Sequence, residues 1–378
     1  MKIERIELRL VRMQLRAPFQ TSFGTEYERE CIIIAVQGGG LTGWGECVAS
    51  RGVTGGSASR LDWRLYSYET TVTAWHILRD FLIPQVLHQP LSIAQMVKAG
   101  QQLRGHPLAR AGLEAALWDI TSQLEGIALG RALGGVRDRV SVGVSIGIQP
   151  TYETLVGKVD EFLAQGYRRI KIKIKPGYDL EAVKRIRAKH PDLLLQVDAN
   201  SAYTLADAPL FETMDEYRLL LIEQPLGWDD IYEHSKLQPR LRTPICLDES
   251  IHSAGQARLA LELGAAKIIN IKPGRVSGFT ESRKIHDLCQ ARSVPVWCGG
   301  MLETGIGRAG NLALASLPNF TLPGDISASD RYYLEDLVDP PFTLNPDSTL
   351  TTPTGSGLGV TVNLKRLDAF TVRRETFE

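Results

Sequence analysis

The chain of 378 residues is long enough for one large domain and a smaller one. Its 43 basic and 43 acidic residues give a formal net charge of zero, so no bulk charge favours nucleic acid or an acidic membrane. Residues 1–7 carry charges of both signs, unlike a signal peptide, and no apolar run is long enough to span a bilayer. The five cysteines show no CxxC spacing, so we expect reduced thiols and a cytoplasmic protein.

The first 50 residues predict a β-meander. Residues 3–14 alternate between apolar and polar, residues 31–36 form an apolar run, and residues 42–46 return after three glycines. Between the first two strands we expect a loop at residues 18–24, which carries Phe19 and Phe23. Helical patterns follow as far as Leu133, and Gly134-Gly135 ends this region.

After residue 135 the pattern becomes repetitive. Apolar runs recur at intervals of roughly 25 residues with helical segments between them, which is typical of a (β/α) barrel. The runs end at Gly147, Lys175, Asn200, Pro225, Ser250, Lys272, Gly300 and Pro323. We therefore expect a capping domain at 1–135, a barrel at 136–325, and a segment at 326–378 that returns to the capping domain.

Residues 169–175 alternate strictly between basic residues and isoleucine. In isolation this pattern indicates a half-exposed strand with its lysines in water. Helical patterns flank it at 152–165 and 179–190, however, and strands between helices form parallel sheets that are covered on both faces. Lys171 and Lys173 would then face the barrel interior, where burial and neighbouring groups can lower the pKa of a lysine.

The strand ends carry the residues expected to do chemistry, because barrel active sites lie at the carboxyl ends of the strands. Asp198, Glu223 and Asp248 end three successive strands and would converge at one mouth. A hard divalent cation would relieve their repulsion, and oxygen ligands suit Mg²⁺ better than zinc. The alternative is helix N-capping by Asp198 and Asp248. With Lys173 on one side and Lys272 on the other, the set predicts proton abstraction beside a carboxylate, as in enolase-type sites.

Five motifs in this order resemble the enolase superfamily, in its muconate-lactonising-enzyme-like subgroup. They are Lys171-Ile172-Lys173, Asp198-Ala199-Asn200, Glu223-Gln224-Pro225, Asp248-Glu249-Ser250 and Lys272-Pro273-Gly274. Residues 295–305 and 322–325 resemble o-succinylbenzoate synthases and N-succinylamino acid racemases within the subgroup. The resemblance implies a (β/α)7β modified TIM barrel with an N-terminal α+β capping domain.

The resemblance also implies roles for individual residues. Asp198, Glu223 and Asp248 would bind Mg²⁺ or Mn²⁺, Lys173 would be the principal acid and base with Lys171 beside it, and Lys272 would face the opposite side of the substrate. The remaining implied site residues are Asn200 and Glu249 as supports, Ser145, Gly300, Met301 and Leu302 around a succinyl group, and Phe19 and Phe23 on a lid. Residues 51–64 look like an insertion relative to the family.

Two activities remain open. One is dehydration of a cyclohexadiene carboxylate to o-succinylbenzoate, a menaquinone precursor, and the other is racemisation of N-succinylamino acids. Both act on a small carboxylate with a succinyl group. A sugar-acid dehydratase is disfavoured because residues 297–299 lack a histidine, and a dipeptide epimerase because residues 323–327 lack an Asp-x-Asp pair. A non-catalytic binding protein of the same fold is the third alternative, and a homo-oligomer is compatible with the sequence.

Arg275 carries one further hypothesis. It lies three residues after Lys272, and a guanidinium close to an ammonium group lowers the pKa of the lysine. A neutral Lys272 could accept a proton, which racemisation in both directions requires. We therefore hypothesise that Arg275, counted among the substrate-binding residues, makes racemisation available on a scaffold that also dehydrates. The alternative is that Arg275 pairs with a surface carboxylate.

Overall fold

A computed structural model describes residues 1–51 and 65–378. The insertion expected at 51–64 lies, apart from its first residue, outside the described residues. In the described part, no helix combines the length and the apolar character needed to cross a bilayer.

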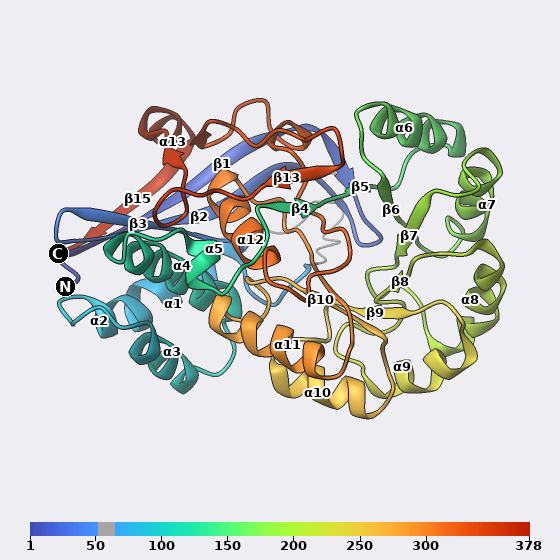
Figure 1. The fold of residues 1–378 in the computed structure, drawn as a ribbon, viewed down its shortest axis with the longest axis horizontal. Helices are drawn as coiled ribbons and strands as arrows, with labels where there is room; N and C mark the ends of the chain where they lie inside the picture. Colours follow the sequence, from blue (N-terminus) through green and yellow to red (C-terminus); the bar gives the residue numbers. More distant parts are fainter. Residues whose placement is uncertain (52–64) are drawn as a thin grey trace, which may run out of the picture.

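A four-stranded antiparallel sheet forms the centre of the capping region. Its order is β15-β1-β2-β3, with β1 at Arg5–Gln20, β2 at Thr25–Gly38, β3 at Leu41–Cys47 and β15 at Thr371–Phe377. The turn between β2 and β3 places Gly39 and Gly40 at φ 56° and 77°, the left-handed region that a two-residue hairpin turn requires. The strand β15 joins the sheet from the far end of the sequence, so the two chain ends lie side by side (Figure 1).

The apolar run in β2 is explained by burial of the sheet on both faces. Ile32 and Ile34 pack into the capping core, whereas Cys31 and Ile33 point to the other face and join the barrel core. A strand covered on both faces has no polar face, which is why residues 31–36 show no alternation. The helices on the capping side are α1 (Thr71–Ile77), a π-helical turn (Leu78–Leu82), α2 (Ile83–Val86), α3 (Ile93–Gln102), α4 (Pro107–Leu124) and α5 (Leu129–Ala132).

The barrel contains seven parallel strands in chain order, β5 to β11. They span Val144–Ile146, Arg169–Lys173, Leu194–Asp198, Ile222–Glu223, Ile245–Leu247, Ile268–Ile271 and Val296–Cys298. The helices between and after them are α6 (Tyr152–Ala164), α7 (Leu180–Lys189), α8 (Ala208–Met214), α9 (Tyr232–Leu237), α10 (Ala254–Glu262), α11 (Phe279–Ala291) and α12 (Gly305–Ala315). This confirms the predicted barrel with its capping domain.

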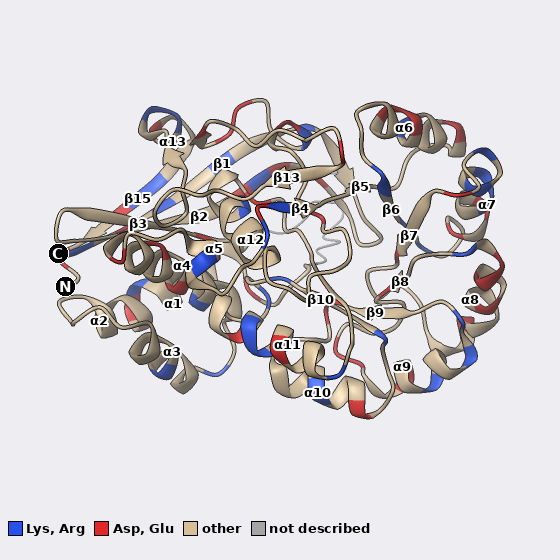
Figure 2. Ribbon diagram, viewed as in Figure 1, with Lys and Arg blue, Asp and Glu red and all other residues tan. Residues whose placement is uncertain are grey.

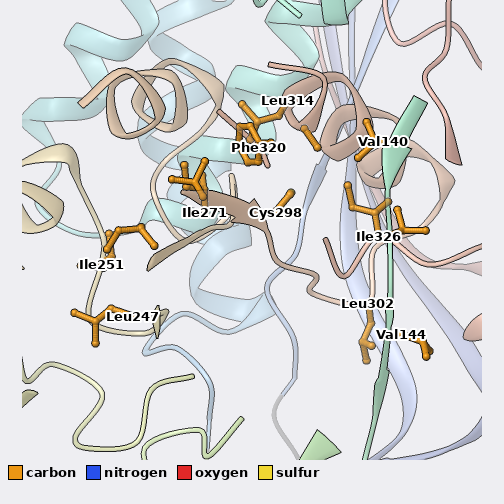
Figure 3. Close-up of a cluster of buried hydrophobic side chains, with 14 of the residues drawn as sticks. Val140, Val144, Leu247, Ile251, Ile271, Cys298, Leu302, Leu314, Phe320 and Ile326 are labelled. Atoms are coloured by element: carbon orange, nitrogen blue, oxygen red, sulfur yellow. The ribbon is translucent and has the colours of Figure 1, made fainter. Parts of the chain in front are cut away.

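The eighth apolar run closes the barrel without forming a regular strand. Phe320 bridges Val296 in β11, and Gly324 bridges Val142 ahead of β5, both in parallel. The first run also differs from expectation, because its early part forms β4 (Arg139–Ser141), which pairs antiparallel with β13 (Thr349–Thr351). Figure 3 shows side chains at this closure, with Cys298, Phe320 and Ile326 among them. The tail continues through β12 (Val338–Asp339), β14 (Thr361–Val362) and α13 (Leu364–Phe370) to β15.

Glycines allow β3 to lie directly on α4. A Cβ atom added at Gly45 would lie 2.1 Å from the Gly112 carbonyl oxygen and 2.7 Å from the Ala116 nitrogen, so any side chain would push strand and helix apart. Gly157, on the exposed face of α6, has no atom within 4 Å of such a Cβ. The two positions therefore respond to the same substitution in opposite directions.

We expect Gly45→Ala to destabilise the protein by about 2 kcal/mol or more, because backbone atoms cannot yield locally. Gly157→Ala should stabilise it by about 0.5–1 kcal/mol, because alanine loses less conformational entropy in a helix. Urea unfolding of both variants, followed by circular dichroism, measures the two effects. Equal changes would show that β3 and α4 are not in direct backbone contact.

Candidate active site

A pocket with about 880 Å³ of empty volume, part of it open to solvent, lies between the capping region and the carboxyl ends of the barrel strands. The predicted site residues that line it are Phe19, Phe23, Ser145, Lys171, Lys173, Asn200, Lys272, Gly300, Met301 and Leu302. The two phenylalanines come from the β1–β2 hairpin, which reaches from the capping sheet to β5 (Figure 1). The structure thus brings residues from both ends of the sequence to one cavity.

The two lysines of β6 pair with carboxylates on the neighbouring strands. The register places Lys173 opposite Asp198, and Asp198 opposite Glu223. Lys173 Nζ donates to Asp198 Oδ2 at 2.6 Å, and Lys171 Nζ lies 2.9 Å from Glu223 Oε2 and 3.1 Å from Asp198 Oδ2. Figure 2 shows the basic stretch on β6. These side chains are all at least nine-tenths buried, so the charges compensate one another in a dry interior.

A second cluster lies at the ends of β9 and β10. Lys272 Nζ donates to Asp248 Oδ2 at 2.6 Å, and Tyr66 Oη donates to Asp248 Oδ1 at 2.8 Å. Arg275 also pairs with Asp248 Oδ1, and its Nε donates to the Ile251 carbonyl at 2.6 Å. Three cationic or hydroxyl groups therefore share one buried carboxylate.

The structure places Arg275 outside the lining of this pocket, whereas its hypothesised role in racemisation stays a prediction. Its side chain is buried and bonds to Asp248 and to backbone carbonyls, and it is not among the described residues that line the pocket. Its partner is an internal carboxylate, not a surface one. Burial lowers the pKa of Lys272, but the charge of Asp248 outweighs it and holds the pKa well above its usual range, contrary to the lowering we expected from Arg275.

Burial and like charge act differently on the three strand-end carboxylates. Burial and the charge of Asp198 raise the pKa of Glu223 well above its usual range. Burial also opposes ionisation of Asp198, but Lys173 and Lys171 outweigh it and lower the pKa. The pKa of Asp248 is likewise lowered, because Lys272 and Arg275 outweigh burial. The neighbouring cations thus favour the ionised form of Asp198 and Asp248, whereas burial and like charge disfavour the ionised form of Glu223.

The donor set suits a hard divalent cation, since all three carboxylates offer oxygen and lie on neighbouring strands. Their oxygens contact ammonium groups instead, and the described residues contain no cluster of three or more His, Cys, Asp or Glu side chains arranged for metal binding. Two further buried oxygens lack a partner among the described residues, Asn200 Oδ1 and Glu249 Oε2. Buried oxygens that accept no hydrogen bond are available as ligands for a cation.

Glu249 and Asn200 support each other at the edge of this mouth. Asn200 Nδ2 donates to Glu249 Oε1 at 2.9 Å, and the Asn200 nitrogen donates to Asp198 Oδ1 at 3.0 Å. Burial and the charge of Asp248 raise the pKa of Glu249 to about 7. The pair therefore links the ends of β7 and β9.

The hairpin that carries Phe19 is docked at three points. The Ile148 nitrogen donates to the Gln20 carbonyl at 2.8 Å, and Ser22 Oγ contacts the Asn200 carbonyl at 3.3 Å. The Phe19 ring meets Tyr332 edge-on with centroids 6.0 Å apart. In contrast to the expected loop at 18–24, β1 continues through Gln20, although its register with β2 shifts between Gln14 and Phe19. Phe19 itself pairs with Glu26 of β2 after this shift.

The wall expected to receive a succinyl group lies beside this hairpin. Ser145 Oγ is buried and has no hydrogen-bond partner among the described residues. Met301 and Leu302 follow β11, and the Met301 nitrogen donates to Glu303 Oε2 at 2.8 Å. Ser145 therefore keeps a free hydroxyl for a polar ligand, whereas the Met301 amide is already bonded.

Two residues that contact the lysines, Asp325 and Tyr66, were not predicted as site residues from the sequence. Asp325 lies 2.5 Å from Lys171 Nζ through Oδ2 and 2.7 Å from Arg169 Nη1 through Oδ1. It lies two residues after the end of the eighth apolar run, so the rule that site residues follow barrel strands could have identified it. Tyr66 contacts Lys272, with the ammonium group 4.5 Å from the ring centroid. No sequence signal marked Tyr66, which belongs to the capping region.

The family comparisons agree with this geometry. Residues 5–134 match the N-terminal domain of the mandelate racemase / muconate lactonizing enzyme family, and residues 154–366 match the enolase C-terminal domain-like family. The chain therefore belongs to the enolase superfamily, as the motifs predicted.

Individual relatives cover nearly the whole chain. An o-succinylbenzoate synthase of Geobacillus kaustophilus is 47% identical over 98% of this chain and 96% of its own. An N-succinylamino acid racemase of an Amycolatopsis species is 48% identical over 99% of both. A solved structure of an enolase superfamily member from Listeria innocua superposes with a TM-score of 0.92, at 38% identity, over 100% of this chain and 99% of its own.

Glu69 is a further buried acid in the pocket wall. It accepts hydrogen bonds from the Leu108 and Ala109 nitrogens, at 2.6 and 3.1 Å, and so caps the start of α4. Burial raises the pKa of Glu69 from its ordinary 4.5 to about 7. The folded protein therefore holds this proton more tightly than the unfolded chain does.

A pH dependence of stability follows. The stabilising contribution of protonated Glu69 is fully present below about pH 4.5 and is lost as the pH rises through 7, up to about 3 kcal/mol. Glu69→Gln removes this titration, so the difference in unfolding free energy between variant and wild type should shift in favour of the variant from pH 4.5 to 8. Urea titrations across that range test it. Parallel pH curves for the two proteins would contradict the raised pKa.

Proposed function

We propose that the protein is a metal-dependent o-succinylbenzoate synthase that acts in menaquinone biosynthesis. It would remove water from 2-succinyl-6-hydroxy-2,4-cyclohexadiene-1-carboxylate. Racemisation of N-succinylamino acids is the second candidate activity of the same pocket. The observation that carries the proposal is the arrangement of Lys173 and Lys272 on β6 and after β10, with three barrel strands between them, around one pocket. Full-length relatives with either activity in their names support both candidates.

Asp198, Glu223 and Asp248 are proposed to hold Mg²⁺ or Mn²⁺. When bound, the cation supplies positive charge to the substrate carboxylate and so stabilises the enediolate. The same cation would compete with the ammonium groups that contact these carboxylates here. A lysine that loses its carboxylate partner gives up its proton more readily.

In the proposed dehydration, Lys173 is the only group that must move a proton. Lys173 Nζ takes the α-proton of the substrate, and the same group then donates it to the departing hydroxyl, which leaves as water. Lys272 stays cationic on the other side and stabilises the enediolate. Lys171, which Asp325 and Glu223 hold, provides a fixed positive charge beside Lys173. Phe19 and Phe23 exclude water from this chemistry.

Racemisation makes a different demand on Lys272. One lysine removes the α-proton while the other, protonated, delivers a proton to the opposite face, so both must exchange protons. Ser145 and the backbone of Gly300, Met301 and Leu302 would hold the succinyl group in either reaction.

The cellular location, the oligomeric state and the binding partner are also proposals. All five cysteines are buried free thiols, which supports a reducing, cytoplasmic location. A homo-oligomer stays a prediction from the sequence, and the proposed partner is a small carboxylate substrate with a succinyl group.

The proposed metal ligands can be tested individually. Asp198→Asn, Glu223→Gln and Asp248→Asn should each lower turnover by about a thousandfold or more, because each removes a charge that holds the cation. EDTA should abolish activity reversibly, and Mg²⁺ should raise the melting temperature of the wild type but not of the variants. Asp160→Asn removes an exposed carboxylate that pairs with Lys189 and serves as the control. Full activity in metal-free buffer would rule out this mechanism.

The two candidate activities can be separated at Lys272. Lys272→Arg keeps a positive charge but cannot give up its proton. We expect it to lose racemisation, and deuterium exchange of one enantiomer, by about a thousandfold, while dehydration falls about tenfold. Lys173→Arg should lose both activities. If Lys272→Arg reduced both activities equally, Lys272 would be a proton carrier in dehydration as well.

A further inference from the structure

The loop from Gly299 to Thr304 forms one wall of the pocket and lies directly on a catalytic lysine. It joins β11 to α12, and Gly300, Met301 and Leu302 line the cavity. A Cβ atom added at Gly299 would lie 2.6 Å from Lys272 Cε and 2.4 Å from Asn270 Oδ1. Any shift of the loop therefore changes both the cavity and the space around Lys272.

The loop has a strained backbone that other groups hold in place. Leu302 has a φ of 57°, a left-handed conformation that is unfavourable for a residue with a branched side chain. Tyr333 Oη donates to the Leu302 carbonyl at 2.5 Å, and the Gly305 nitrogen donates to Asp336 Oδ1 at 2.6 Å. Tyr333 as donor and Asp336 as acceptor both belong to the C-terminal segment, and they fix the loop from one side.

Glu46 of the capping sheet fixes the loop from the other side. This residue of β3 is 7% exposed. Its Oε2 accepts from Thr304 Oγ1 at 2.7 Å, from the Thr304 nitrogen at 3.1 Å and from the Gly307 nitrogen at 3.0 Å. A Cβ atom added at Gly307 would lie 2.7 Å from the same oxygen. One side chain of the capping domain thus holds both the end of the wall loop and the first turn of α12.

We propose that Glu46 is a positioning residue that sets the pocket wall and thereby selects the length of the acyl group on the substrate. The inference rests on the proposed function, because it assumes that this wall receives the succinyl group. Glu46 does not touch the substrate; it acts through Thr304 and the backbone of Gly300 to Leu302. Loss of its hydrogen bonds lets the strained loop relax, so the cavity no longer matches a four-carbon acyl chain.

Asp119 provides a matched control elsewhere in the same domain. It is 1% exposed and accepts hydrogen bonds from the Trp44 and Leu358 nitrogens, both at 2.7 Å. Asp119 therefore connects the capping domain to the C-terminal segment by accepting from backbone nitrogens. Glu46 connects the capping domain to α12 in the same way. Neither Glu46 nor Asp119 lines the main pocket.

The test compares racemisation of N-succinyl and N-acetyl derivatives of one amino acid in the Mg²⁺-loaded protein. Glu46→Gln places an NH₂ group against backbone donors and should lower the succinyl-to-acetyl ratio of kcat/KM about tenfold, mainly through KM. Asp119→Asn should lower the melting temperature but keep the ratio within about twofold. Glu46→Asp keeps a carboxylate, so its succinyl-to-acetyl ratio should lie between those of Glu46→Gln and the wild type.

Two further measurements keep the inference falsifiable. Gly307→Ala should displace the Glu46 carboxylate and lower the ratio in the same way, although a helical Gly→Ala change is otherwise stabilising. Amide hydrogen exchange of residues 299–307 should accelerate in Glu46→Gln and not in Asp119→Asn, whether or not a substrate is known. An unchanged succinyl-to-acetyl ratio of kcat/KM in both Glu46→Gln and Gly307→Ala would overturn the inference. If the wild type turned over neither compound, the proposed racemisation would be refuted instead. In that case, unchanged amide hydrogen exchange of residues 299–307 in Glu46→Gln would refute the role of Glu46.

Discussion

The site depends on the compensation of buried charge at the barrel mouth. Three carboxylates end adjacent strands, and each contacts at least one ammonium or guanidinium group. Burial of any one of these ions without its partner would be strongly unfavourable. The lysines and carboxylates therefore stabilise each other in the folded protein. The same pairing would connect folding to chemistry, because a divalent cation held by the carboxylates, as proposed, would free the lysines from their carboxylate partners.

Buried carboxylates also join the two domains. Glu46 contacts the start of α12, and Glu114 in α4 accepts a hydrogen bond at 3.0 Å from the Thr280 nitrogen near the start of α11. A carboxylate at the start of a helix meets free backbone donors and the positive end of the helix dipole. Both helices follow strands that carry site residues, β10 and β11, so the capping domain is attached close to the catalytic groups.

The sequence predicted what depends on regular repetition. The period of the barrel placed Lys171, Lys173, Asp198, Glu223 and Asp248 at the correct strand ends, because parallel strands bring their carboxyl ends to one face. The family and the fold are confirmed, whereas the roles of these residues stay predictions. What the sequence could not predict are contacts between distant segments. Asp325 reaches Lys171 across the barrel closure, where the chain forms only isolated bridges and no regular strand.

Tyr66 and Glu46 illustrate the same limit. Both belong to the capping region, and nothing in their local sequence states which barrel strand they will meet. Arg275 illustrates this limit too: spacing along the chain placed it near Lys272 but could not show that Asp248 contacts both side chains.

The pairing of β15 with β1 has a consequence for biosynthesis. The capping sheet contains one strand from residues 5–20 and its neighbour from residues 371–377. During synthesis, β1 therefore leaves the ribosome long before β15 exists. The edge of β1 that pairs with β15 stays unpaired while the barrel is synthesised. The four-stranded capping sheet can therefore be completed only after the whole chain has been synthesised.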